Sequence, residues 1–266
     1  MDATLLDEQS QLPADFEETI HALAELGIRF APASGRPLYT LEAMFPTLQD
    51  ELVFIGDNGG AIRWKGQNLF TSEMSPEGWR ALNRLTREQG DIAVLCGLES
   101  AYVERPFAVH DAVLRHFYTK IEYVDRLEDV TAPADKFTIY LPQHNAQQAY
   151  DTIYASQRSI YSVAVAGECW VDIMNPGVHK GAALQTLGQL WGLPSESMMA
   201  FGDTYNDAEM LRTAKYGFLM ENGSAPLRQK VPFLAPSHRE AGVMQVLHRV
   251  LAQNGCVCPE DFVPAH

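Results

Sequence analysis

Patterns typical of strands and helices alternate at both ends of the 266-residue chain, and this alternation restricts the fold more than any other feature. Near the N-terminus, apolar residues at helical spacing over 16–26 come before a strand pattern, IRFAPASG, at 28–35. Towards the C-terminus, helical patterns at 181–191, 206–214 and about 240–252 alternate with the strand patterns MMAFGD and GFLM. Alternation of this kind predicts a parallel sheet with helices on its faces.

The middle of the chain is organised differently. A short strand is expected at 51–56, a hairpin with the sequence AIRWKGQNLF follows it, and a helix is expected from 76 to 89 between a Ser75 cap and Gly90. The region after this helix contains strand patterns at 92–97, 136–142, 161–167 and 169–174, and helical patterns at 107–117 and 145–157. The last two strands are nearly contiguous, which predicts antiparallel pairing.

We therefore predict an α/β fold in which a Rossmann-like parallel-sheet core is interrupted by an inserted α+β domain. The core is expected to comprise 1–79 and 169–266, and the inserted domain 80–168.

Composition limits the classes of partner. The chain has 20 Lys and Arg against 34 Asp and Glu, a formal net charge of −14, which argues against nucleic acid and anionic membranes because both are bound mainly through Lys and Arg. No apolar run approaches the ~20 residues of a membrane span and no signal-peptide pattern is present, so a cytoplasmic protein is expected. The four cysteines, two of them in a C-x-C spacing at Cys256 and Cys258, are expected to be reduced thiols. An anionic substrate would need a local cluster of donors or a metal ion.

The strongest chemical signal is the segment AFGDTYNDAEML at 200–211. Asp203 directly follows a strand pattern, and Asn206 and Asp207 open the next helix. Ligands of open α/β sheets bind at the carboxyl ends of the strands, and oxygen ligands suit a hard cation such as Mg²⁺. The alternative is that Asn206 and Asp207 only cap the helix and that Asp203 only makes a turn.

Two further segments can bind an anion. In APASGRP, Ser34 and the backbone of Gly35 and Arg36 can donate to a phosphate, although Ser-Gly turns are common. In NPGVHKGAAL, Lys180 stands at the start of a helix, where the helix dipole disfavours a cation. Lys180 is therefore either solvated or directed at an anion, whereas the neighbouring His179 is expected to be a loop residue.

The order of these segments resembles the four motifs of the haloacid dehalogenase superfamily of phosphatases. More narrowly, it resembles the Cof-type branch, which has its cap inserted between the Ser and Lys motifs (a C2B cap), and bacterial sugar-phosphate phosphatases in particular. The pieces that carry the resemblance are GDTYNDAEML, ASGRP, DNGG and GVHKG. The family's first motif is Asp-x-Asp-Gly-Thr; Asp2 and Thr4 match its second Asp and its Thr, and Ala3 replaces the Gly.

By this resemblance the nucleophilic aspartate lies immediately before Met1, at the end of a central strand. We expect a mis-assigned start or a truncation, with natural loss of the nucleophile as the alternative. We also expect the chain as written to be inactive or nearly so, with an unfilled gap between the two neighbours of that strand.

The resemblance also implies the roles of the site residues. Asp2 is the general acid and base, and its backbone carbonyl binds the metal. Asp203 and Asp207 hold Mg²⁺. The transferring oxygens are stabilised by Lys180 and Ser34.

Further substrate contacts follow from the same resemblance. Asn206 orients the phosphate or Lys180, Gly35 and Arg36 belong to the phosphate-binding turn, and Asn58 in DNGG lies near the active site. Candidate cap residues for substrate choice are Glu99, Tyr102, His116 and Tyr118.

The expected substrate is a small phosphorylated metabolite, first a phosphosugar, with nucleotides and flavin precursors as alternatives. Neither nucleic acid nor a membrane is expected as a partner, and the chain is expected to be a monomer or a weak homodimer. A second hypothesis is a catalytically silent protein that binds phosphate esters and regulates a partner; the retained Asp2, Lys180, Asp203 and Asp207 argue against it.

Overall fold

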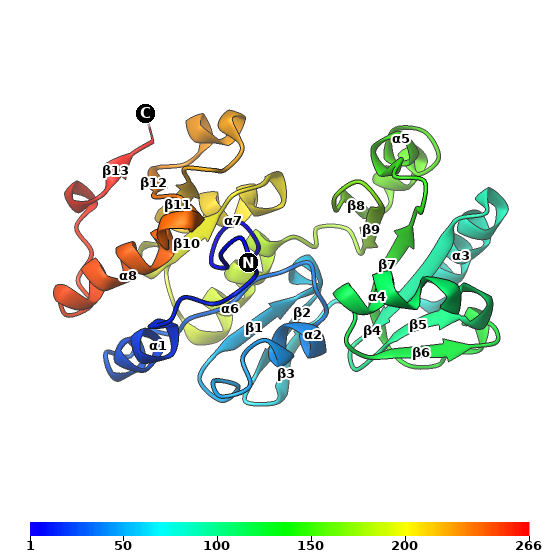
Figure 1. The fold of residues 1–266 in the computed structure, drawn as a ribbon, viewed down its shortest axis with the longest axis horizontal. Coiled ribbons are helices and arrows are strands. Elements are labelled where there is room, and N and C mark those ends of the chain that lie inside the picture. The colour runs from blue at the N-terminus through cyan, green and yellow to red at the C-terminus, as the bar shows by residue number, and fades with distance from the viewer. Residues whose placement is uncertain (266) are drawn as a thin grey trace.

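The strands of residues 1–265, the part of the chain that the computed structural model describes, form three sheets (Figure 1). One sheet has the order β10 (Met199–Gly202), β11 (Tyr216–Met220), β12 (Phe233–Ala235) and β13 (Val263–Pro264), and its first three strands are parallel. The helix α7 (Ala208–Thr213) connects β10 to β11, and α1 (Phe16–Glu25) and α8 (Gly242–Ala252) pack on each other beside this sheet. These elements confirm the predicted parallel core.

A second sheet consists of β1 (Val53–Gly56), β2 (Ala61–Trp64) and β3 (Gln67–Thr71), all antiparallel. The predicted strand at 28–35 runs parallel to β1, but it forms only one isolated bridge, between Ala33 and Ile55. Phe30 and Pro32 also accept backbone hydrogen bonds from β1. Within the described part of the chain the segment pairs on one side only, so it does not become a regular strand. The helix α2 (Leu38–Ala43) follows this segment directly.

The core strands are therefore divided between two sheets, and the N-terminal residues lie at the division (Figure 1). β10 is the edge of its sheet, yet Ala33 from the other group packs against the apolar cluster that contains Ala200. Residues 1–6 form a tight turn in which the Met1 carbonyl accepts three backbone N–H bonds. This turn contacts both groups, because Thr4 bonds to Asp203 after β10 and Asp2 bonds to Arg36.

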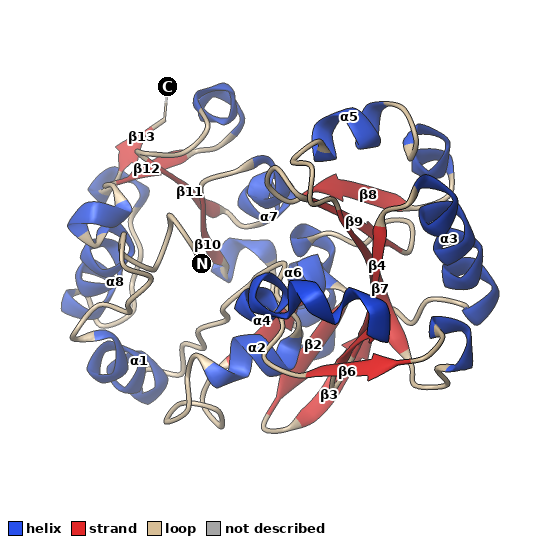
Figure 2. Cartoon of the chain, turned by 45° about the vertical axis from the view of Figure 1, so that its right-hand side comes forward, coloured by secondary structure: helices blue, strands red, loops and turns tan. Residues whose placement is uncertain are grey.

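The third sheet belongs to the inserted part. Its strand order is β6 (Ile121–Val124), β5 (Ala101–Glu104), β4 (Ile92–Gly97), β7 (Ala134–Tyr140), β9 (Trp170–Met174) and β8 (Ser162–Val165). The helices α3 (Pro76–Gln89) and α5 (Ala146–Asp151) cover one face, and α4 (Asp111–Phe117) lies against the other (Figure 2). Side chains along β4 alternate between the two faces of the sheet. Ala93 and Leu95 belong to the apolar cluster on the face that α3 and α5 cover, whereas Val94 and Cys96 belong to the cluster on the α4 face. Burial on both faces explains the continuous apolar pattern of this strand.

This sheet tests two predictions made from the sequence. β8 and β9 pair antiparallel, which confirms the predicted pairing. β9, which the predicted boundary after 168 assigns to the core, pairs with both β7 and β8. We therefore propose that the inserted domain runs from the start of α3 to the end of β9.

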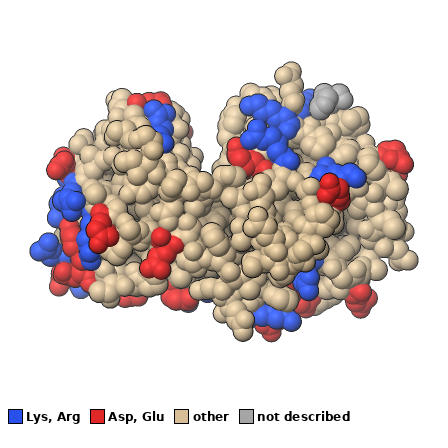
Figure 3. Space-filling model, turned by 180° about the vertical axis from the view of Figure 1, so that it is seen from behind, with Lys and Arg blue, Asp and Glu red and all other residues tan. Residues whose placement is uncertain are grey.

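The two parts are visible as lobes with a notch between them on the face seen in Figure 3. The helix α6 (Lys180–Trp191) leads from the inserted part back into the core. His179 caps its N-terminus by accepting the N–H of Ala182, and Gly192 ends it in the left-handed conformation (φ 65°). In residues 1–265, no helix is long and apolar enough to cross a membrane.

Candidate active site

The first residue of α6, Lys180, is buried and paired with a carboxylate. Its Nζ donates to Oδ1 of Asp207 at 2.6 Å, and the other oxygen of Asp207 accepts the backbone N–H groups of Asp203 (3.0 Å) and Thr204 (3.2 Å). Burial opposes ionisation of Asp207, but the Lys180 ammonium, the Met1 amino group and the hydrogen bonds from Lys180 and the Asp203 backbone together outweigh it and hold the pKa of Asp207 below its usual value. Of the two alternatives for Lys180, the structure therefore shows the lysine directed at an anion.

Asp203 lies beside this pair, directly after β10. Its Oδ1 accepts a hydrogen bond from the Thr4 hydroxyl at 2.7 Å. Burial raises the pKa of Asp203, and the negative charge of Asp207 raises it further. The α-amino group of Met1 is buried in the same region, although Met1 as a residue is half-buried, and burial together with the charge of Lys180 lowers the pKa of that amine. The N-terminal turn thus places an amino group among the residues predicted to do the chemistry.

The turn after the 28–33 segment forms one wall of the site. The Ser34 hydroxyl oxygen accepts the backbone N–H of Arg36 at 3.1 Å and is buried. A Cβ on Gly35 would lie 3.1 Å from Oδ1 of Asn58, so the close approach of this turn to Asn58 favours glycine. Asn58 adopts the left-handed conformation (φ 56°), which asparagine tolerates better than most residues.

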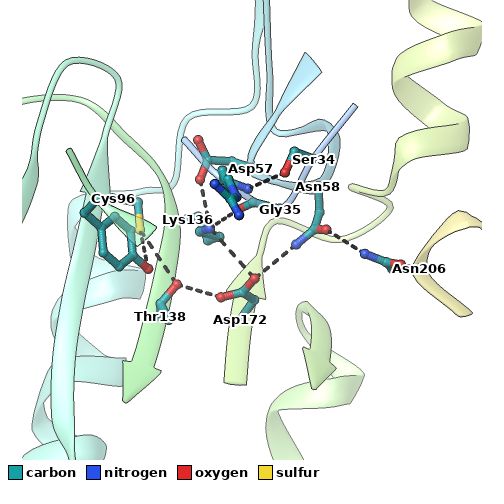
Figure 4. A network of polar contacts seen from close by, with 11 residues as sticks. Ser34, Gly35, Asp57, Asn58, Cys96, Lys136, Thr138, Asp172 and Asn206 are labelled. Atoms are coloured by element: carbon teal, nitrogen blue, oxygen red, sulfur yellow. Dashed lines mark hydrogen bonds and ion pairs between the residues drawn. The ribbon is translucent and has the colours of Figure 1, made fainter. Parts of the chain in front are cut away.

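Asn58 links the turn to other predicted site residues. Its Oδ1 accepts from Nδ2 of Asn206 at 3.3 Å, and its Nδ2 donates to Oδ2 of Asp172 at 3.0 Å (Figure 4). Asn206 therefore contacts the turn side of the site rather than Lys180.

Asp2 has a different partner from the one its predicted role implies. Its carboxylate is largely exposed and accepts from Nη2 of Arg36 at 3.1 and 3.2 Å. The sequence did not predict this ion pair. It joins the predicted general acid, Asp2, to the predicted phosphate-binding arginine, Arg36.

The core half of one cavity is formed mainly by predicted site residues. The cavity has a volume of about 200 Å³ and is lined on this side by Asp2, Ser34, Gly35, Arg36, Asn58 and Asn206, together with Pro37. Lys180, Asp203 and Asp207 do not line this cavity, but Asn206, which does, directly precedes Asp207 in the chain. The structure thus gathers the predicted residues into two groups, and the N-terminal turn bonds to both, through Thr4 to Asp203 and through Asp2 to Arg36.

Asp203 and Asp207, with the backbone carbonyl of Asp2, offer only oxygen donors, and such a set suits Mg²⁺. Within residues 1–265, Asp203 accepts a single side-chain hydrogen bond, so its second oxygen remains available to a cation. Asp207 is already bonded to Lys180 and to two backbone groups. No group of three or more His, Cys, Asp or Glu side chains in the described chain is arranged to hold a metal. The donor chemistry fits Mg²⁺, with Asp203 as the residue best placed to hold it.

The inserted part supplies the opposite wall of the cavity. The residues on this side are Phe117, Tyr118, Lys136, Thr138, Ala164, Val165, Ala166, Trp170 and Asp172. Of the four candidate cap residues only Tyr118 is among them. The carboxylate of Glu99 instead pairs with Arg63, and the ring of His116 lies against Phe117.

Lys136 and Asp172 were missed by the sequence analysis. Each is a charged residue in a mainly apolar strand pattern: Lys136 begins KFTIYLP, and Asp172 lies inside CWVDIM. A charge in a strand that is buried on both faces needs a partner, and that signal could have identified them.

Known proteins are similar to this chain over nearly its whole length. A model of the family described as haloacid dehalogenase-like hydrolase matches residues 1–247. The 5-amino-6-(5-phospho-D-ribitylamino)uracil phosphatase YbjI of Escherichia coli K12 is 31% identical over 255 residues, which cover 94% of each chain. A solved structure from Streptococcus mutans UA159 has a TM-score of 0.85 at 29% identity and covers 95% of this chain and 97% of its own. The structure of a haloacid dehalogenase subclass IIB sugar phosphatase has a TM-score of 0.78 at 19% identity, covers 94% and 96% of the two chains, and supports the fold.

Proposed function

Because the chain belongs to the haloacid dehalogenase-like hydrolase family, as its motifs predicted, we propose that it hydrolyses sugar and polyol phosphates with Mg²⁺ through an aspartyl-phosphate. The chain is a phosphoric monoester hydrolase, like its named relatives. The observation that carries the proposal is the buried Lys180–Asp207 pair with Asp203 beside it, next to Asn206, which lines a cavity together with the Ser34–Arg36 turn.

The nucleophile in this proposal is an aspartate placed directly before Met1. In support, the amino group of Met1 is buried, and the charges of Lys180, Asp203 and Asp207 act on it. An aspartate there attacks phosphorus, the ester oxygen leaves, and water then cleaves the aspartyl-phosphate. Mg²⁺ would neutralise the negative charge of the phosphate.

The other residues bind the phosphate and move protons. Asp2 protonates the leaving oxygen and later takes the proton of the attacking water, which requires its carboxylate to exchange Arg36 for the substrate. The Ser34 hydroxyl and the Lys180 ammonium donate to the phosphate oxygens. Asn206 and Asn58 hold the turn side of the site in place.

The substrate class rests on the relatives. The Escherichia coli relative is named for an ester whose phosphate is carried by a ribityl chain, and the IIB relative is named as a sugar phosphatase. Both names fit a phosphorylated polyol or sugar, and a substrate panel that includes nucleotides distinguishes the alternatives.

Chelation of divalent metal is expected to lower hydrolysis of sugar phosphates by at least about a hundredfold, because a bound cation contributes several kcal/mol to stabilising the transferring phosphate. The measurement is release of inorganic phosphate by the protein extended at its N-terminus with the proposed aspartate, before and after exhaustive chelation. Added Mg²⁺ should restore the rate, and an Asp203→Asn variant should respond poorly to it. Undiminished hydrolysis after chelation would contradict the metal assignment.

A further inference from the structure

Lys136 lines the wall of the cavity that the inserted part supplies, and it has an unused donor. Its side chain is 2% exposed; Nζ donates to the carbonyl oxygen of Gly35 at 2.6 Å and forms an ion pair with Asp57 at 2.9 Å. Oδ2 of Asp172 is 3.8 Å from Nζ, too far for a direct hydrogen bond. An ammonium group has three N–H donors, so in the described chain at least one has no partner within hydrogen-bond distance.

Asp172 has unused acceptor positions beside that donor. It is 4% exposed, Oδ1 accepts from the Thr138 hydroxyl at 2.7 Å, and Oδ2 accepts from Asn58 at 3.0 Å (Figure 4). A carboxylate offers about four acceptor positions, so two remain. Lys136 and Asp172 both line the cavity. A ligand hydroxyl group can accept a hydrogen bond from the Lys136 ammonium and donate one to the Asp172 carboxylate. It therefore satisfies both groups at once.

The surrounding charges favour a neutral polar ligand. Burial opposes the charge on Lys136, but Asp172 and Asp57 outweigh it and raise the pKa of Lys136 well above its usual value. Burial raises the pKa of Asp57, and burial together with Asp57 raises that of the neighbouring Asp135. A hydroxyl adds no charge to this cluster, whereas an apolar group would leave the spare donor and acceptors of Lys136 and Asp172 unsatisfied.

We propose that Lys136 and Asp172 form a hydroxyl-binding subsite that selects phosphate esters of polyols and sugars over esters of unsubstituted alcohols. The subsite adjoins the phosphate-binding turn, because Lys136 donates to the carbonyl oxygen of Gly35. It therefore binds a hydroxyl group close to the ester. The inference rests on the proposed function in that it takes the cavity as the ester-binding site.

The test compares two five-carbon esters, D-ribitol 5-phosphate and pentyl phosphate, by titration calorimetry. The wild-type chain is expected to bind ribitol 5-phosphate about tenfold or more tightly than pentyl phosphate, the usual scale of a hydrogen bond to a charged group. In Asp172→Asn the ratio of the two dissociation constants should fall towards one. Because both esters carry the same phosphate, this ratio is insensitive to a general disturbance of the turn.

Asp91→Asn is the matched control. Asp91 also belongs to the inserted part and accepts a hydrogen bond from Tyr154, but it does not line the cavity, so its variant should keep the wild-type ratio. Equal affinity of the wild type for both esters, or an unchanged ratio in Asp172→Asn, overturns the subsite.

Hydrolysis of the same two esters separates this inference from the proposed function. An intact binding ratio without hydrolysis by the N-terminally extended protein contradicts the proposed function and leaves the subsite standing. Equal affinity with efficient hydrolysis of both esters contradicts only the subsite.

Discussion

Replacing Lys180 by Met is expected to lower kcat/KM for phosphate esters by about 10²–10³ or more, in the N-terminally extended protein, and also to destabilise the fold. The lost donor acts on charge that develops on the transferring phosphate, and removing one such donor has an effect of this size in other hydrolases. Asp207 would then be a buried carboxylate without its partner, which costs about 3–5 kcal/mol of unfolding free energy. Steady-state kinetics and urea unfolding measure the two effects.

A double variant tests whether Lys180 has more than a structural effect. Lys180→Met with Asp207→Asn removes the isolated charge, so stability should recover in part while hydrolysis stays low. Lys215→Met, a change at an exposed lysine, serves as the matched control and should leave both quantities near wild type. Recovery of activity together with stability would show that Lys180 has only a structural role.

Adding a hydrophobic strand that ends in Asp directly before Met1 is expected to raise both hydrolysis and melting temperature. Loss of a nucleophile in another hydrolase lowers turnover on the order of 10⁶-fold, so a gain approaching that size is expected. Among residues 1–265, β10 pairs only with β11, and the 28–33 segment pairs only with β1. A strand between them would pair on both sides and satisfy backbone groups that now have no partner in a ladder.

The same extension ending in Asn is the control for this prediction. It should raise the melting temperature as much as the Asp version, because it supplies the same strand, but it should not raise hydrolysis. Equal rates of hydrolysis with and without the extension would mean that Asp2 is the nucleophile rather than the acid.

The parts of the fold that local signals specify were predicted well. The helix over 76–89 was predicted at its observed bounds, because Ser75 caps it by accepting the N–H of Gly78 and Gly90 ends it with φ 75°. The hairpin after β1 was also predicted correctly, since Lys65 and Gly66 adopt the positive φ angles that its tight turn needs.

Other elements depend on partners that are distant in sequence. The 28–35 pattern was predicted as a strand, but whether it forms one depends on neighbours on both of its sides. The strand β12 has only three residues, too few for a period to be recognised, and its parallel partner β11 stabilises it.

The candidate site likewise combines residues that the sequence identifies with residues whose positions depend on distant partners. The order of Ser34, Lys180 and Asp203 along the chain predicted which residues meet near the cavity. Asp172 was missed because its position beside Thr138 follows from the pairing register of β7 and β9, which no local pattern contains. The Asp2–Arg36 ion pair was missed because its two residues meet only through the fold of the N-terminal turn.

The most direct test of the proposed chemistry is to locate the phosphoryl group during turnover. The extended protein is mixed with a sugar phosphate and Mg²⁺, quenched in acid, digested, and analysed by mass spectrometry for phosphorylated aspartate. The proposal predicts phosphate on the aspartate before Met1, and none in the version that carries Asn there. Sustained hydrolysis with phosphate on Asp2, or with no phosphorylated aspartate at all, would contradict it.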